Sequence, residues 1–199
     1  LQRERARIMS TGVTSYAWAA EADRVLVPLD GALYVLDGVG EGAPPPRRLF
    51  DPTDSRWAEV GAGPLLDAKI SADGTLVCFV WGDEVCCCAV PAGGEVDGAS
   101  PRRLTSGARG EGKTNGLADY CAQEEMDRYA GFWLSPDAAV VAFEEVDERH
   151  IPPFRIARHA ASPHEVLLLR VVPLTAYLLP ATCDLLPPAY CLPPTAYHL

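Results

Sequence analysis

The sequence has 199 residues and carries 17 Lys and Arg against 27 Asp and Glu, which gives a formal net charge of −10. This length predicts one domain or part of a larger protein, and the acidic balance disfavours nucleic acid and anionic membrane surfaces while suiting a cationic ligand. The 7 cysteines show no Cys-x-x-Cys or Cys/His metal spacing. We therefore expect neither a metal nor another cofactor, and a reducing, cytoplasmic location.

The N-terminal stretch is a charged arm, in which residues 3–7 are Arg-Glu-Arg-Ala-Arg. Taken alone, these arginines indicate a solvated arm. The chain opens at Leu1 rather than Met, so we expect that the true N-terminus is missing and that a targeting signal cannot be judged. The uncharged apolar run at residues 171–183 contains two prolines and is too short to span a bilayer.

An acidic turn followed by an apolar strand occurs three times, in segments that begin at Ala19, Ser71 and Ser135. The first two copies are followed by a second strand and then by Pro-Arg-Arg-Leu, at residues 46–49 and 101–104. Turn, strand, turn, strand with a period of roughly 50 residues is typical of a β-propeller blade. We predict an all-β fold, an incomplete β-propeller of about two to three blades. The alternative is a generic β-sandwich with chance similarity.

Two stretches resemble ligand sites, but their context argues against that interpretation. Residues 86–88 are three consecutive cysteines. Successive strand residues point to opposite faces, so these are expected to be small apolar thiols within a strand. Residues 107–114 match the phosphate-binding pattern GxxxxGK[ST]. The pattern needs a buried strand before it and a helix after it, whereas Asn115-Gly116 is a turn signal. A Gly-rich connection is the preferred interpretation, and nucleotide binding is the weaker one.

Residues 115–137 are the most informative part of the chain. After the turn signal, the composition favours a short inserted helix of about three turns over residues 117–128. An aromatic and apolar strand is expected over residues 129–134, ending at the turn Ser-Pro-Asp of residues 135–137.

The predicted helix carries two adjacent carboxylates, Glu124 and Glu125. Two acids this close repel each other unless they share a cation. An ammonium group has three donors and no acceptor, so it suits two carboxylates that reach it from two sides. The alternative is a solvated helix face on which Glu124 and Arg128 form an i,i+4 ion pair.

Residues 123–133, Gln-Glu-Glu-Met-Asp-Arg-Tyr-Ala-Gly-Phe-Trp, resemble the double-glutamate segment of the dipeptidyl peptidase IV family. This segment is most similar in sequence to the branch of the family that contains dipeptidyl peptidases 8 and 9. The arginine run at residues 3–7, followed by Gly-Val-Thr-Ser-Tyr at residues 12–16, resembles the entrance to the N-terminal domain of the same family. Asp147-Glu148 continues the likeness, which fades near Arg158.

The resemblance implies that Glu124 and Glu125 bind the free N-terminal amine of a peptide substrate and that Arg7 contacts a nearby backbone carbonyl. Family members join an N-terminal propeller to an α/β-hydrolase domain with a Ser-Asp-His triad, and remove dipeptides whose second residue is Pro or Ala. No GxSxG nucleophile elbow occurs in the 199 residues. We therefore assign no catalytic residue, and expect the chain to be inactive without the missing hydrolase domain.

The likeness divides the chain in two. Residues 1–158 are predicted to form a partial N-terminal propeller domain, and residues 159–199 a Leu/Pro-rich tail unrelated to the family. We expect the tail to be poorly ordered, because prolines this dense cannot sit in central strands. The sequence thus favours the substrate-recognition part of a serine-type dipeptidyl peptidase. The alternative is a non-catalytic β-propeller scaffold that binds protein partners.

Overall fold

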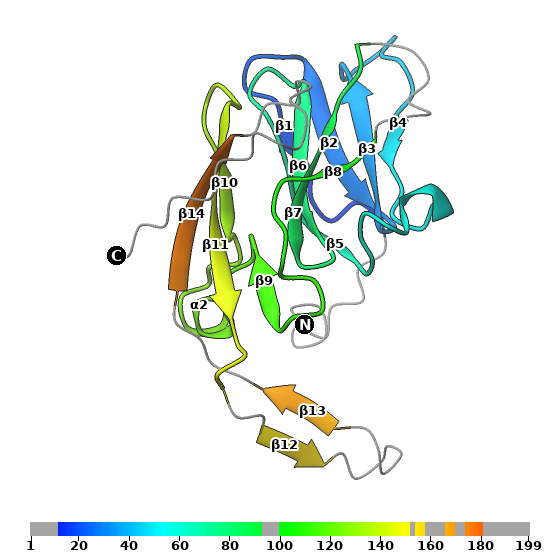
Figure 1. Cartoon of the computed structure of the whole chain (residues 1–199). Coiled ribbons are helices and arrows are strands. Elements are labelled where there is room, and N and C mark those ends of the chain that lie inside the picture. Colours follow the sequence, from blue (N-terminus) through cyan, green and yellow to red (C-terminus); the bar gives the residue numbers. More distant parts are fainter. Residues whose placement is uncertain (1–11, 93–99, 152–153, 158–165, 170–173, 181–199) are drawn as a thin grey trace.

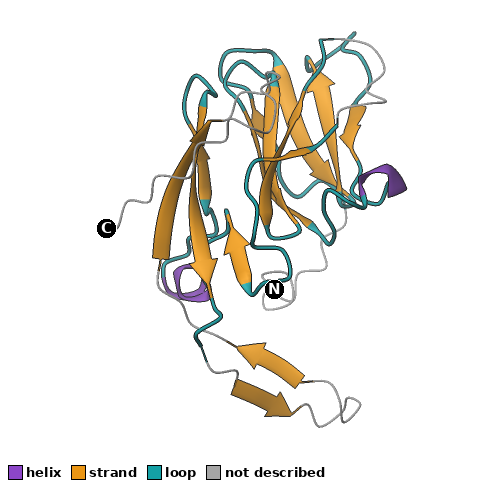
Figure 2. Ribbon diagram, in the orientation of Figure 1, coloured by secondary structure: helices purple, strands orange, loops and turns teal. Residues whose placement is uncertain are grey.

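The structure is a computed structural model that describes residues 12–92, 100–151, 154–157, 166–169 and 174–180. Within these ranges the chain is all-β, with three four-stranded antiparallel sheets and one two-stranded sheet (Figures 1 and 2). The described helices are the short 3₁₀-helix η1 (Ser55–Trp57) and the α-helix α2 (Tyr120–Glu125). The all-β prediction is confirmed.

The first two sheets are simple meanders, in which each strand pairs with the next one along the chain. The first sheet is formed by β1 (Ala17–Trp18), β2 (Arg24–Leu29), β3 (Ala32–Asp37) and β4 (Arg47–Phe50). The second sheet is formed by β5 (Leu65–Ile70), β6 (Leu76–Trp81), β7 (Glu84–Ala89) and β8 (Arg102–Arg103). The repeated Pro-Arg-Arg-Leu therefore begins the last strand of each sheet, β4 or β8.

The third sheet has a different order, because its central strand β11 pairs with three others. It is formed by β9 (Lys113–Asn115), β10 (Phe132–Leu134), β11 (Val140–Asp147) and β14 (Leu174–Pro180). Strands β12 (Phe154–Ala157) and β13 (Val166–Leu169) pair as a separate hairpin. Strands β13 and β14 lie within residues 159–199. The rest of that segment lies outside the described residues, so its predicted poor order stays a prediction.

The predicted sequence repeat corresponds to a repeated structure. Strands β2, β6 and β11 begin at Arg24, Leu76 and Val140, the same offsets at which the three turn-and-strand segments align. The turns before β6 and β11 also share their hydrogen bonds. The Ser71 hydroxyl donates to Asp73 at 2.6 Å and accepts from the Leu76 N–H at 3.0 Å. Ser135 makes the same two contacts, with Asp137 at 2.5 Å and Val140 at 2.9 Å.

The core consists of two hydrophobic clusters, one on each face of the second sheet. All six residues of β6 are buried. Val77, Phe79 and Trp81 pack against the first sheet, while their neighbours on β6 pack against the third. Three sheets stacked in series differ from a two-sheet sandwich, in which each sheet buries one face. The arrangement is consistent with part of a β-propeller.

The three cysteines of β7 take part in this packing. Cys86 and Cys88 belong to the cluster shared with the first sheet, and Cys87 belongs to the cluster shared with the third. They are at most 1% exposed. Burial, followed by the charges of Cys87 and Glu84, raises the pKa of the Cys86 thiol to about 12, so the thiol is neutral. The prediction of apolar thiols facing opposite sides of a strand is confirmed.

Candidate functional site

The segment with the two glutamates interrupts the edge strand of the third sheet. Strand β10 pairs with residues 141–143 of β11, and β9 pairs with residues 145–147 along the same strand. Residues 116–131, which we call the spur, leave the sheet between β9 and β10 (Figure 1). The spur therefore belongs to the third sheet and is not a connection between sheets.

This edge is where the first strands of the three sheets come together. Strand β5 contacts β1 of the first sheet. On its other side, the Lys69 ammonium of β5 donates to the Phe132 carbonyl of β10 at 2.7 Å and lies 3.8 Å from the centroid of the Phe132 ring. Lys69 also forms a 2.6 Å ion pair with Asp67. Burial raises the pKa of Asp67 despite this ammonium. The end of the spur therefore lies beside β5, whereas its beginning at Gly116 lies against Val80 of β6 and Val85 of β7.

The base of the spur is closed by close backbone contacts. Leu117 and Ala130 form an isolated antiparallel bridge. A Cβ atom at Gly131 would lie 2.3–2.5 Å from backbone atoms of Leu117, so the two chain segments approach as closely as they do because residue 131 has no side chain. Gly116, with φ of +84°, donates to the Glu144 carbonyl at 2.8 Å, and the Glu144 N–H donates to the Gly131 carbonyl at 2.8 Å.

Helix α2 occupies the tip of the spur and is shorter than predicted. Asp119 is its N-cap and accepts hydrogen bonds from the Cys121 and Ala122 N–H groups at 2.8 and 3.2 Å. The prediction of a helix over residues 117–128 is wrong at both ends, because Leu117 pairs across the base of the spur and Asp127 has a φ of +50°. The predicted strand at residues 129–134 begins only at Phe132, because Ala130 forms an isolated bridge with Leu117 instead of pairing in the sheet.

The structure places both predicted amine-binding glutamates at the C-terminal end of α2. The Glu124 and Glu125 side chains are exposed, and they are followed by Met126, which is 72% exposed. Arg7, the third predicted binding residue, lies outside the described residues. Arg128 is beyond the end of the helix, and its guanidinium binds Glu144 and the Ala130 carbonyl.

Two buried carboxylates near the spur were missed by the sequence analysis. Glu144 on β11 is 4% exposed and Glu84 at the start of β7 is 1% exposed. Glu84 stands in a strand whose other residues are mostly buried and apolar, so an acid in an apolar strand pattern was the available signal there; Glu144 follows the apolar residues 140–143 of β11, a weaker signal of the same kind. The partners could not be read from the pattern, because they come from distant loops.

Glu84 explains the Gly-rich segment at residues 107–114. Its carboxylate accepts hydrogen bonds from the Thr105 hydroxyl at 2.5 Å, the Ala108 N–H at 2.7 Å and the Asn115 amide at 2.9 Å. Lys113 lies in β9 and forms a 2.7 Å ion pair with Glu145. A phosphate loop needs free N–H groups and a helix start at this lysine. The loop instead wraps a protein carboxylate and enters a strand.

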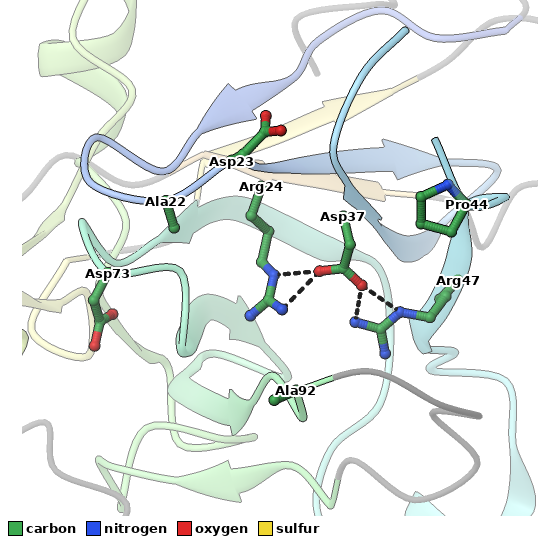
Figure 3. A pocket seen from close by; sticks show the side chains of 8 residues that line it. All are labelled: Ala22, Asp23, Arg24, Asp37, Pro44, Arg47, Asp73 and Ala92. Carbon is green, nitrogen blue, oxygen red and sulfur yellow. Dashed lines mark hydrogen bonds and ion pairs between the residues drawn. The ribbon is translucent and has the colours of Figure 1, made fainter. Parts of the chain in front are cut away.

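A hollow of about 480 Å³ lies between the first and second sheets (Figure 3). Asp37 sits there between Arg24 and Arg47, with contacts of 2.6–2.7 Å. Burial alone would raise the pKa of Asp37, but the hydrogen bonds and charges of both guanidinium groups outweigh it and lower the pKa. Arg24 also donates to the Gly74 carbonyl at 2.7 Å, and Arg47 to the Pro91 carbonyl at 3.3 Å. These side chains join the two sheets.

Within the described residues, no group of three or more His, Cys, Asp or Glu side chains could hold a metal ion. No helix in the same part of the chain is long and apolar enough to cross a membrane.

The fold and the spur define a class of protein: an all-β domain of stacked antiparallel sheets that carries an acidic helix on the edge strand of its third sheet. Residues 47–169 match the family described as the dipeptidyl peptidase IV (DPP IV) N-terminal region. The match covers more than half of the chain, so the chain belongs to this family. The family resemblance predicted from the sequence is confirmed. The match includes both spur glutamates and extends past residue 158, where the likeness was expected to fade.

Proposed function

We propose that this chain is the part of a serine-type dipeptidyl peptidase that recognises the free N-terminus of a peptide substrate. In the full-length parent a hydrolase domain would release N-terminal dipeptides from peptides that have Pro or Ala in the second position. The described sheets would be two complete blades and part of a third. The parent would belong to the branch of dipeptidyl peptidases 8 and 9 and act in the cytoplasm.

The observation that carries the proposal is the position of Glu124 and Glu125. They stand at the tip of a spur that interrupts the first strand of the third sheet, beside β5, the first strand of the second sheet, which in turn contacts β1 of the first sheet. In a closed propeller the first strands surround the central channel, so a spur from this edge can reach a ligand there. Both side chains are exposed and therefore accessible to an incoming cation.

The two carboxylates of Glu124 and Glu125 suit a positively charged ammonium group better than a neutral or anionic group. Each carboxylate can accept a charge-assisted hydrogen bond from an ammonium, and such bonds contribute about 1.5–3 kcal/mol. Arg7 would bind a backbone carbonyl of the same peptide and offset the repulsion between the two acids. Fixing the N-terminus in this way sets the distance to the scissile bond, which is how positioning would restrict cleavage to dipeptides.

The test is a titration of the 199-residue chain with alanyl-proline amide, followed by calorimetry or NMR, and with the N-acetylated form as the control ligand. We expect the free amine to bind and the acetylated ligand to bind at least tenfold more weakly. Glu124→Gln and Glu125→Gln should each weaken binding of the free amine about tenfold, since 1.4 kcal/mol corresponds to a factor of ten.

Glu59, an exposed glutamate outside the spur, provides the matched control, and Glu59→Gln should leave the affinity unchanged. Equal binding of free and acetylated ligands, or unchanged binding by both spur variants, would reject amine recognition. A propeller scaffold for protein partners would then be the better interpretation.

A further inference from the structure

Arg128 lies outside the pair of glutamates, yet it contacts each part of the spur. Its N–H donates to the Ala122 carbonyl in α2 at 3.0 Å. Its guanidinium donates to the Ala130 carbonyl at the base of the spur at 3.0 Å and to Glu144 of β11 at 2.5 Å. One residue therefore connects the helix, the base of the spur and the central strand of the third sheet.

The partner of Arg128 cannot move easily. Glu144 is 4% exposed, and both of its backbone groups bind the base of the spur, through Gly116 and Gly131. Its Oε2 atom has no hydrogen-bond partner among the described residues. A buried carboxylate that lacks other donors depends on its cation, because an unpaired charge in the interior is strongly destabilising. Arg128 is therefore held in one place.

The consequence for α2 follows from its length. A helix of six residues has little stability of its own, so its orientation depends on what holds its ends. Asp119 caps the N-terminal end. At the other end, the N–H groups of Met126 and Arg128 both donate to the Ala122 carbonyl, in the turn that carries the two exposed glutamates.

We propose that the Arg128–Glu144 ion pair is a positioning pair, which fixes the direction in which Glu124 and Glu125 leave the spur. The pair does not touch the ligand. Its effect on amine binding rests on the function proposed above, whereas its effect on the order of α2 can be measured without any ligand.

The experiment compares the full 199-residue chain with Arg128→Met and with the double variant Arg128→Met/Glu144→Leu. The single variant leaves a buried carboxylate without its cation, so it should lower the melting temperature. The double variant removes both charges, and apolar replacement of a buried ion pair is often neutral for stability. The melting temperature of the double variant should return towards that of the wild type, although the positioning contact is absent.

Hydrogen exchange of residues 120–126 separates positioning from stability. We expect exchange at these amides to be at least tenfold faster in both variants, while the amides of β6 keep wild-type exchange in the double variant. Binding of alanyl-proline amide should weaken about tenfold in the double variant. Lys113→Met is the matched control, because Lys113 pairs with Glu145 on the same strand but does not contact α2. This variant should leave exchange in α2 unchanged.

Wild-type exchange in α2 of the double variant would overturn the inference, whatever the binding result. Faster exchange in α2 combined with unchanged amine binding, where Glu125→Gln does reduce binding, would also overturn it. If Glu124→Gln and Glu125→Gln have no effect on binding, the proposed function fails. Faster α2 exchange in the double variant would still support the structural part of the inference in that case.

Discussion

Gly131 gives the sharpest prediction for the base of the spur. Its φ lies outside the left-handed region, so alanine is acceptable to the backbone itself. The added Cβ atom would, however, lie 2.3–2.5 Å from three backbone atoms of Leu117, where ordinary contacts begin at 3.4 Å. The two segments must separate by roughly 1 Å, and overpacking of this kind costs about 1–3 kcal/mol.

For a chain of this length, 1 kcal/mol corresponds to about 2–4 °C in melting temperature. Gly131→Ala should therefore lower the midpoint of a thermal melt followed by circular dichroism by roughly 2–12 °C. Hydrogen exchange should be faster at residues 116–118 and 130–132, because the Leu117–Ala130 bridge opens.

Gly110→Ala is the control for this experiment. Gly110 has a φ of +73° and nothing within 4 Å of an added Cβ, so alanine there costs only the backbone strain of about 1–2 kcal/mol. It should leave exchange at the base of the spur unchanged. If Gly131→Ala melts like the wild type and keeps wild-type exchange at the base of the spur, the close contact with Leu117 is not a constraint.

Three further predictions concern the sheets. Ala138 has a φ of +54° where the preceding repeat has Gly74, so Ala138→Gly should raise the free energy of unfolding by about 0.5–1 kcal/mol in a urea titration. A decrease would show that the turn is unstrained. Thr105→Val removes a hydroxyl that donates to Glu84, and should cost about 1–3 kcal/mol in the same assay; an unchanged midpoint would contradict the buried network. The pKa of Asp37 is lowered, so its ion pairs stabilise the fold above the ordinary carboxyl pKa and lose this effect as the pH falls through the lowered value. The stability difference between the wild type and Asp37→Asn should therefore be largest near pH 7 and shrink in acid, whereas a difference independent of pH would refute the assignment.

The parts of the fold that depend on local chemistry were predictable. Ser71 and Ser135 each begin a turn whose bonds are made within five residues, so the repeat reveals where β6 and β11 start. The same holds for the side chains of Cys86, Cys87 and Cys88 in β7, which alternate between the two hydrophobic clusters. The ends of α2 were not predictable, because Leu117 is drawn into a bridge with a residue 13 positions away.

The candidate site was predictable in part. The sequence singled out Glu124 and Glu125 from their unusual adjacency, and for Arg128 it offered only a partner at helical spacing, Glu124, as part of the alternative interpretation. The structure binds Arg128 to Glu144, which lies 16 residues further along and is reached only after the chain has turned back into the sheet. Glu84 was missed for a similar reason, because its donors come from positions 21–31 residues later. Such pairings depend on tertiary structure.

The interrupted edge strand has a consequence for variation in this part of the chain. Since β9 and β10 pair with neighbouring stretches of β11, the tip of the spur around α2 can vary without removing any strand pairing from the third sheet, as long as the Leu117–Ala130 bridge and the Arg128–Glu144 pair are kept. The third sheet can therefore support different sequences at the tip of the spur. Insertions and deletions should be tolerated at the tip far better than in β9 or β10, which makes this a suitable place to graft a different binding loop.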